Sequence, residues 1–305
     1  MLNILIIGYG SIGKRHARIL RKIKQVNLYI YSKRKLKIKN ILNNINKIIE
    51  IEFDFIIISN ETSEHHLTLK KIINLNFNGK ILIEKPVFNK FMEIDEFYKK
   101  KILVAYNFRF NKLLQDFRNK LLKEKIISVN IYAGQYLPNW RPYIDYKSSY
   151  SASRSKGGGV LLDLSHEIDY LQWIFGKVKK VFASGGKYSN LKINTEDVYQ
   201  IKLETEKCNL VFLELNYLDK PGKRIISCNT NKHSYTLNLL KNTINIDGQT
   251  KKYFFKKNHS YENMLNSLIN NNPKNFCKFN EANEILKIIG SIKKSNKNNQ
   301  LVKVS

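Results

Sequence analysis

The sequence predicts an α/β protein with an amino-terminal doubly wound parallel sheet, followed by a second, α+β domain. Three observations predict it. Short apolar runs alternate with helical patterns over the first hundred residues, a glycine-rich turn follows the first apolar run, and strand-like alternation dominates after residue 175. A chain of 305 residues can bury enough surface for two such domains.

The composition indicates a globular chain, with 43% apolar residues, 14 glycines and 5 prolines. Three widely spaced cysteines are too few for a disulfide framework or a thiolate metal cluster, so we expect reduced thiols, no metal site and a cytoplasmic location. No apolar run approaches the roughly 18 residues of a membrane span, and we expect no membrane association.

The charge is unusual, with 53 Lys and Arg against 25 Asp and Glu, a formal net charge of +28. The lysines are spread over almost every segment and are interleaved with Asn and Ile. This spread favours a solvated lysine surface over a nucleic-acid site, because base readout needs a motif and none is visible.

The first apolar run, residues 2–8, is typical of a buried parallel strand, and the pattern over residues 14–24 is typical of a helix. Between them lies a GxGxxG turn. Its glycines allow a tight turn, a close approach of the backbone to a pyrophosphate, and close packing of helix on strand. The turn predicts a dinucleotide site formed by Gly8, Gly10, Ser11, Ile12 and Gly13.

The second strand is expected at residues 28–31, and its end usually carries an acid that holds the ribose 2′-hydroxyl. Here the sequence has Ser32, Lys33, Arg34 and Lys35 instead, a hydroxyl followed by three cations. A hydroxyl and cations suit a 2′-phosphate, so NADP(H) is favoured, with NAD(H) possible. The alternative is that these cations only reflect the general abundance of lysine.

Two more strands are predicted at residues 53–59 and 80–83, with a helix at 67–73 between them. Ligands of doubly wound sheets bind beyond the carboxyl ends of the strands. The residues expected there as cofactor ligands are Asn60, His65, Glu84 and Lys85. His65 has a helix-capping or packing role as its alternative.

Hydride transfer needs a charge that stabilises a developing alkoxide and a group that exchanges the hydroxyl proton. Lys85 suits the first task, with a plain surface lysine as the alternative. His166 suits the second; Asp163 and Asp169 flank it at three residues on either side of a predicted helix, and a packing histidine is the alternative. We therefore predict Lys85, His166 and Asp163 as catalytic residues and Asp169 as a substrate ligand.

Two further segments are candidates for contact with a substrate. Residues 106–111 alternate polar and aromatic side chains, which predicts a strand that presents Arg109, although a structural use of this arginine is an equal alternative. Aromatic and basic residues cluster between 136 and 154, and Trp140 and Arg141 in this cluster would suit a sugar or a carboxylate. This cluster could equally be an oligomer contact.

Five motifs in order resemble the Gfo/Idh/MocA oxidoreductase family: GYGSIGKRH, NETSEHH, EKP, YNFRFN and GGGVLLDLSHEID. The resemblance implies a nicotinamide-dependent dehydrogenase or reductase acting on a sugar or polyol, in which Lys85 reaches the reacting oxygen and His166 is the acid/base. It also implies a large open, mostly antiparallel second sheet that pairs subunits into a homodimer or homotetramer. The stretch from GQYLPNW onward is similar to a subgroup associated with bacterial surface-sugar biosynthesis, which adds nucleotide sugars as substrates.

One departure from the family concerns the spacing of Asp163 and His166. Many members place this aspartate four residues before the histidine, whereas here the spacing is three. One residue fewer turns a helical side chain by about 100°, so Asp163 is expected to point toward the fold.

The predicted domains are a dinucleotide-binding domain at 1–118 and a substrate-binding and oligomerisation domain at 119–305. In the second, we expect a long loop from residue 126, a helix at 163–175, and strands at 198–204, 209–217 and 235–240. Three functions are considered, in this order: an NADP-dependent dehydrogenase, a cofactor-binding protein without catalysis, and a basic polyanion-binding protein.

Overall fold

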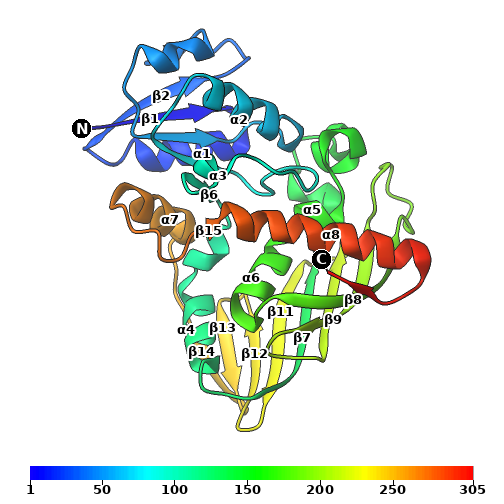
Figure 1. The fold of residues 1–305 in the computed structure, drawn as a ribbon. Helices are drawn as coiled ribbons and strands as arrows, with labels where there is room; N and C mark the ends of the chain where they lie inside the picture. Colours follow the sequence, from blue (N-terminus) through cyan, green and yellow to red (C-terminus); the bar gives the residue numbers. More distant parts are fainter. Residues whose placement is uncertain (305) are drawn as a thin grey trace. The chain divides into compact units, whose positions relative to one another are not determined.

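A computed structural model describes residues 1–304, which divide into two compact units (Figure 1). Unit 1 comprises Met1–Phe110 and Asn258–Asn283, and unit 2 comprises Asn111–Lys257 and the chain from Glu284 onward. The predicted fold class, an α/β protein with a parallel amino-terminal sheet and a large second sheet, is confirmed. The predicted domains were 1–118 and 119–305. The observed units differ mainly because residues 258–283, which come late in the sequence, are part of unit 1.

Unit 1 is built on a seven-stranded sheet in the order β15-β6-β5-β4-β1-β2-β3, in which only β15 is antiparallel. Its strands are β1 (Leu2–Ile7), β2 (Val26–Tyr31), β3 (Ile41–Leu42), β4 (Phe55–Ile58), β5 (Lys80–Ile83), β6 (Ile102–Val104) and β15 (Cys277–Lys278). Its helices are α1 (Ser11–Leu20), α2 (His65–Asn74), α3 (Glu96–Lys99) and α7 (His259–Ile269).

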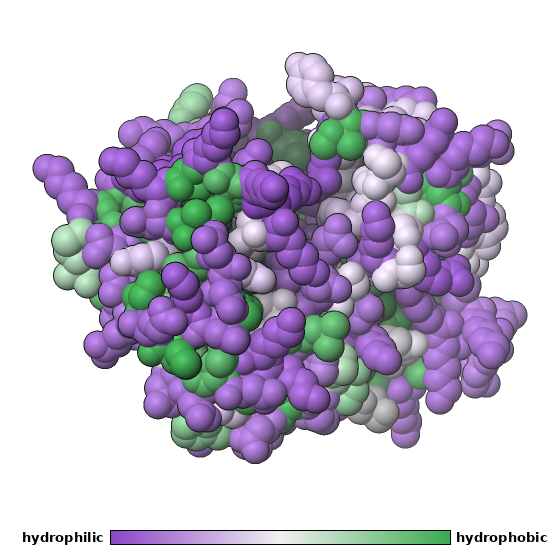
Figure 2. Space-filling view, turned by 90° about the horizontal axis from the view of Figure 1, so that it is seen from above, coloured by the Kyte–Doolittle hydropathy of each residue, from purple (hydrophilic) through white to green (hydrophobic). Residues whose placement is uncertain are grey.

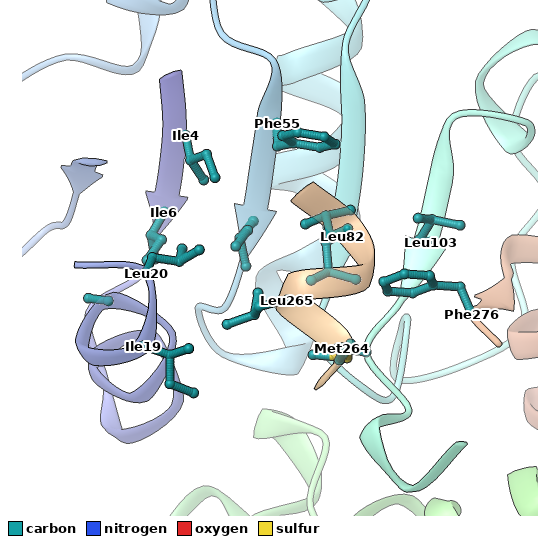
Figure 3. Close-up of a cluster of buried hydrophobic side chains, with 14 of the residues drawn as sticks. Ile4, Ile6, Ile19, Leu20, Phe55, Leu82, Leu103, Met264, Leu265 and Phe276 are labelled. Carbon is teal, nitrogen blue, oxygen red and sulfur yellow. The ribbon is translucent and has the colours of Figure 1, made fainter. Parts of the chain in front are cut away.

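The core of unit 1 explains why the segment 258–283 returns (Figure 3). Ile4 and Ile6 of β1 are fully buried, as expected for the apolar run of a parallel strand covered on both faces. Met264 and Leu265 of α7 pack in the same cluster as these strands and as Leu20 of α1. Without α7 these apolar side chains would be exposed to water, so the fold needs this late segment to complete the first unit.

Residues 107–110 form a 3-10 helix rather than the predicted strand, so that prediction was wrong. The residue after it, Asn111, is the N-cap of α4 (Lys112–Leu121) and accepts hydrogen bonds from the backbone N–H groups of Leu113 and Leu114. Capping satisfies donors that a helix leaves unpaired at its start. The polar alternation in YNFRFN therefore marks a turn and a helix start.

Unit 2 contains a nine-stranded sheet in the order β14-β13-β12-β11-β7-β10-β9-β8-β16, antiparallel except between β7 and β10. Its strands are β7 (Ile126–Gly134), β8 (Val178–Gly186), β9 (Val198–Thr205), β10 (Val211–Asn216), β11 (Lys223–Thr230), β12 (Ser234–Asn238), β13 (Thr243–Ile246), β14 (Gln249–Lys252) and β16 (Val302–Lys303). Its helices are α4, α5 (Val160–Asp163) and α6 (Ser165–Phe175), and α8 (Phe279–Asn298) begins in unit 1 and continues into unit 2.

Residues 126–134 form β7, a central strand of the second sheet, where the sequence predicted the start of a long loop. The irregular segment begins only after Gly134 and runs through four short 3-10 turns to α5. Strand β7 alternates buried Val129 and Ile131 with more exposed neighbours, which is the period expected for a sheet with one covered face.

Figure 2 shows hydrophilic residues over most of the face in view, with apolar residues in scattered small groups. Over residues 1–304, no helix is long and apolar enough to cross a bilayer.

Candidate functional site

Four parallel strands of unit 1 end at the same edge of the sheet. Ile7 pairs with Tyr31 on one side and with Ile58 on the other, and Ile58 pairs with Ile83. The residues that directly follow these strands therefore lie along one edge: Gly8, Ser32, Ser59 and Glu84. This edge is where doubly wound sheets bind their ligands.

The glycine turn has the local geometry that a pyrophosphate requires. Gly8 has φ +94°, and a Cβ built on Gly13 would lie 2.1 Å from the carbonyl oxygen of Gly8, so helix and strand pack too closely for a side chain. A Cβ on Gly10 would meet nothing within 4 Å. No side chain caps α1 and its first turn carries no acid, so its amino-terminal N–H groups and positive dipole suit an anion. The turn fits a dinucleotide.

The predicted ribose-binding turn contains one residue that the sequence did not reveal. Ser32 accepts a hydrogen bond from the backbone N–H of Arg34, at 3.1 Å, which shapes the turn. Lys33 forms an exposed ion pair with Glu64, with Nζ and Oε2 3.1 Å apart. Glu64 comes from the turn before α2 and partly offsets the positive charge of Lys33, while Arg34 and Lys35 are also exposed cations of this turn.

Asn60 and His65 are held largely by internal contacts. The amide of Asn60 donates to the hydroxyl of Thr68 at 2.8 Å, while its Oδ1 is buried and has no hydrogen-bond partner among the described residues. His65 is 1% exposed, and its Nδ1 lies 3.1 Å from the carbonyl oxygens of both Pro86 and Val87. The imidazole of His65 is therefore not placed to touch a cofactor, which corrects the prediction in favour of its packing alternative.

The E-K-P turn follows β5 and places Lys85 at the ligand edge. The carboxylate of Glu84 is 6% exposed and is used internally, because Oε1 lies 2.7 Å from Nε2 of His16 and Oε2 accepts from the backbone N–H of Lys85 at 3.3 Å. Glu84 thus shapes the turn and does not present its side chain as a cofactor ligand. Lys85 itself is partly exposed, as a residue that contacts ligands must be.

Arg109 is a structural residue, which corrects its prediction as a substrate ligand. Its residue exposure is 2%, and its guanidinium lies 2.9 Å from Oε1 of Glu281 and 3.4 Å from the carbonyl oxygen of Phe276. A buried guanidinium must be paired to offset its lost hydration. Arg109 therefore joins the 3-10 turn to the returning segment of unit 1.

The predicted helix at 163–175 is divided into two in unit 2. Helix α5 ends at Asp163, and α6 begins at Ser165. Asp163 is 4% exposed and its Oδ2 accepts a hydrogen bond from the hydroxyl of Tyr217 at 2.6 Å. The Asp163 charge and burial raise the pKa of Tyr150, which also bonds to this carboxylate. Asp163 points into the fold, as its spacing from His166 predicted.

We expect Asp163→Asn to lower stability more than it lowers turnover. The amide would replace a buried carboxylate that two tyrosine hydroxyls share, and losing hydrogen bonds to a charged group costs about 1.5–3 kcal/mol. The thermal midpoint should fall, while kcat stays well above that of His166→Ala. Tyr217→Phe is the matched control, because it removes one of the two hydroxyls. A kcat loss equal to that of His166→Ala with an unchanged midpoint would make Asp163 catalytic.

His166 is partly exposed in the first turn of α6, whereas Asp169 is fully buried. A side chain with no exposed surface cannot reach a substrate, so the prediction of Asp169 as a substrate ligand is wrong for this structure. The turn that carries His166 is anchored by Glu167, whose Oε1 lies 2.7 Å from Nε of Arg224 on β11. Helix α6 thus holds His166 at a defined place in unit 2.

Trp140 and Arg141 belong to the irregular segment after β7. The indole N–H of Trp140 donates to the carbonyl oxygen of Gln135 at 3.1 Å, and its ring meets Tyr217 edge-on at 5.3 Å. The guanidinium of Arg141 lies 5.4 Å from the centre of the Tyr150 ring. Both residues line a small pocket of unit 2. The structure brings them close to the tyrosines that bind Asp163.

Three residues that contact the predicted site residues were not predicted from the sequence. His16, which was not singled out from the sequence, is fully buried against Glu84. Its position on the inner face of an amphipathic helix was a signal of burial, but nothing in the sequence indicated its partner. Tyr217 and Glu64 had no signal, because their partners lie 54 and 31 residues away.

A glycine turn at the carboxyl edge of a parallel sheet, joined to an open and mostly antiparallel sheet, defines the class of two-domain dinucleotide-binding proteins. Residues 125–249 match the family model described as the GFO/IDH/MocA C-terminal domain. Together with the fold, this match confirms the resemblance to the Gfo/Idh/MocA family over the residues that the family model covers. No curated protein sequence matches it.

Solved structures share the fold over almost the whole chain. A putative NADPH-dependent oxidoreductase from Desulfitobacterium hafniense DCB-2 has a TM-score of 0.82 at 17% identity, covering 99% of this chain and 98% of that one. Myo-inositol 2-dehydrogenase from Lactobacillus plantarum has 0.78 at 17%, covering 100% and 99%. The WlbA dehydrogenase from Bordetella pertussis, in complex with NADH and UDP-GlcNAcA, has 0.77 at 14%, covering 100% and 98%.

Proposed function

We propose that this protein is an NADP(H)-preferring oxidoreductase that transfers a hydride between the nicotinamide and a hydroxyl or carbonyl carbon of a sugar, polyol or nucleotide sugar. The observation that carries the proposal is the open, uncapped glycine turn at the same sheet edge as the E-K-P turn. The similar structures support the substrate class, since they include an inositol dehydrogenase and a complex with a UDP-sugar.

Four groups of residues have roles in the proposed chemistry. The bound nicotinamide would accept or donate the hydride. Gly10 and the start of α1 would hold the pyrophosphate through backbone N–H groups, and the Lys85 ammonium would stabilise negative charge on the reacting oxygen. In the oxidative direction the C–H bond supplies the hydride, the O–H proton passes to the His166 imidazole, and a carbonyl remains. Reduction runs through the same groups with His166 as the acid.

We expect the wild type to bind NADPH more tightly than NADH, and Arg34→Ala to remove much of that preference. The exposed guanidinium can form charged hydrogen bonds with a 2′-phosphate, whereas Lys33 is shared with Glu64. Fluorescence titration with both reduced cofactors measures the two dissociation constants. Lys24→Ala removes an exposed lysine outside this turn and is the control. Equal constants in the wild type would contradict the proposed NADP preference.

Exposed aromatic rings on one face of the nine-stranded sheet of unit 2 support the proposed homodimer or homotetramer. Phe182 of β8 and Phe212 of β10 both pair with Lys202 of β9, so they lie on the same face of the sheet. They are 38% and 49% exposed. Apolar rings exposed on one sheet face are typical of surfaces that pair subunits.

The activity is tested by following the absorbance of the reduced nicotinamide with a panel of sugars. The panel includes levoglucosan, L-sorbose, myo-inositol and UDP-GlcNAcA, the compounds named for the similar structures, with NADP⁺ and NAD⁺ for oxidation and with NADPH and NADH for reduction. Turnover of a UDP-sugar would favour a role in surface-glycan biosynthesis. Tight NADPH binding without turnover of any panel member would favour the cofactor-binding protein without catalysis.

A further inference from the structure

Two buried histidines of unit 1 hold the E-K-P turn from opposite sides of Lys85. His16 is 0% exposed and contacts the residue before Lys85, and His65 is 1% exposed and contacts the two residues after it. Neither imidazole is a candidate to touch a substrate, because neither is exposed. Their hydrogen-bond partners are instead the residues next to the partly exposed Lys85 in the sequence.

His16 joins the glycine-turn helix to this turn. It lies in α1, and its Nε2 donates to Oε1 of Glu84 at 2.7 Å, while Oε2 of the same carboxylate accepts from the backbone N–H of Lys85. The ring also meets Tyr261 of α7 edge-on, with centroids 5.7 Å apart. A continuous chain of contacts therefore runs from the helix that would bind the pyrophosphate to the backbone of Lys85.

His65 holds the other side of the turn from α2. Carbonyl oxygens only accept hydrogen bonds, and two of them lie 3.1 Å from Nδ1, whereas Nε2 faces one, that of Asn60, at 3.3 Å. Burial lowers the pKa of His65 and so favours a neutral ring with one proton, for which Nδ1 offers the two shorter contacts. The carbonyls of Pro86 and Val87 are thus tied to one imidazole, and the path of the backbone after Lys85 is restricted.

Packing alone does not account for imidazoles at these two positions. A buried polar ring costs free energy unless it is hydrogen-bonded, and an aliphatic side chain of similar size would fill the same space without that cost. Imidazole at both positions directs hydrogen bonds to three groups of one turn, on either side of Lys85 in the sequence: the Glu84 carboxylate, the Pro86 carbonyl and the Val87 carbonyl.

We propose that His16 and His65 are positioning residues that hold the Lys85 ammonium where it acts on the reacting oxygen, with His16 linking this placement to the cofactor-binding helix. The inference rests on the proposed function, because it assigns the two histidines to the lysine of that site. A displacement of about 1 Å in a catalytic group can cost on the order of 100-fold in rate, so restricting this turn has a measurable consequence.

The proposal that the two histidines restrict the turn at residues 84–88, here called bracing, is tested first without any substrate, by hydrogen exchange of the full chain. His16→Leu and His65→Leu remove the hydrogen bonds and keep apolar bulk, so exchange at the amides of residues 84–88 should increase. His16→Gln and His65→Asn return an N–H donor near the lost Nε2 and Nδ1 positions and should restore slow exchange. Leu69→Ala, a buried change in the same helix as His65, is the matched control and should leave residues 84–88 unchanged.

The effect on catalysis is tested with the panel substrate that has the highest kcat/KM. Each leucine variant should lower kcat by about 10-fold or more while the dissociation constant for NADPH changes less than about twofold. In a Lys85→Ala background the same leucine substitutions should cost little further, because the histidines act through the lysine. The amide variants should recover most of kcat.

The outcomes separate the two proposals. Unchanged exchange at residues 84–88 in both leucine variants overturns the bracing, and so does an equal kcat loss with and without Lys85. Full activity of Lys85→Ala overturns the catalytic role of the lysine instead, and with it the positioning role, even when the exchange data show that the turn is braced.

Discussion

Gly10→Val should yield a folded protein that binds neither NADPH nor NADH measurably. A Cβ at this position meets nothing within 4 Å, and the residue has φ −77°, a conformation open to any amino acid, so the fold tolerates the change. The branched side chain would occupy the space above the start of α1 that a pyrophosphate needs. Losing two charged hydrogen bonds to backbone N–H groups corresponds to roughly 100-fold or more in affinity.

Two other glycines provide controls for this result. Gly290 is an exposed glycine of α8 that also has open space around its Cβ position, so Gly290→Val should bind both cofactors like the wild type. Gly13→Val should instead fail to fold correctly, because its Cβ would lie 2.1 Å from the Gly8 carbonyl oxygen. A folded Gly10→Val protein with wild-type affinity would remove the dinucleotide assignment.

Lys85→Ala and His166→Ala should each lower kcat by roughly 100-fold or more, while NADPH affinity changes little. The alanine at position 85 removes the charge that stabilises the alkoxide, and the alanine at 166 removes the proton acceptor. Steady-state kinetics with the best panel substrate and fluorescence titration measure the two quantities separately. The oxidative rate of the wild type should also decline on acidification, because a protonated His166 cannot accept the substrate proton.

Nearby residues of the same types serve as controls. Lys90→Ala removes a lysine a few residues beyond the E-K-P turn, and His233→Ala removes an exposed histidine of unit 2 that pairs with Asp247 at 2.6 Å. Neither should lower kcat appreciably. A His166→Ala enzyme with full kcat would leave the histidine with a packing role and transfer proton exchange to Lys85.

Local patterns were sufficient for much of unit 1. The predicted strands at 80–83 and 53–59 correspond to β5 and β4, and the GxGxxG turn joins β1 to α1 as expected. Apolar period and glycine spacing are properties of neighbouring residues, so they can be read without knowing the fold. The same reasoning failed at residues 106–111, where alternation over six residues fits a strand, a turn or a helix cap equally well.

The class of fold, the glycine turn and the position of Lys85 just after a strand that ends at the ligand edge could be predicted from sequence patterns. Which polar side chains are used internally became visible only in the folded chain. Arg109 pairs with Glu281, Asp163 with Tyr217, and His16 with Glu84. The physical reason is that a buried charge or imidazole needs a partner, and these partners lie 172, 54 and 68 residues away, where no local pattern can identify them.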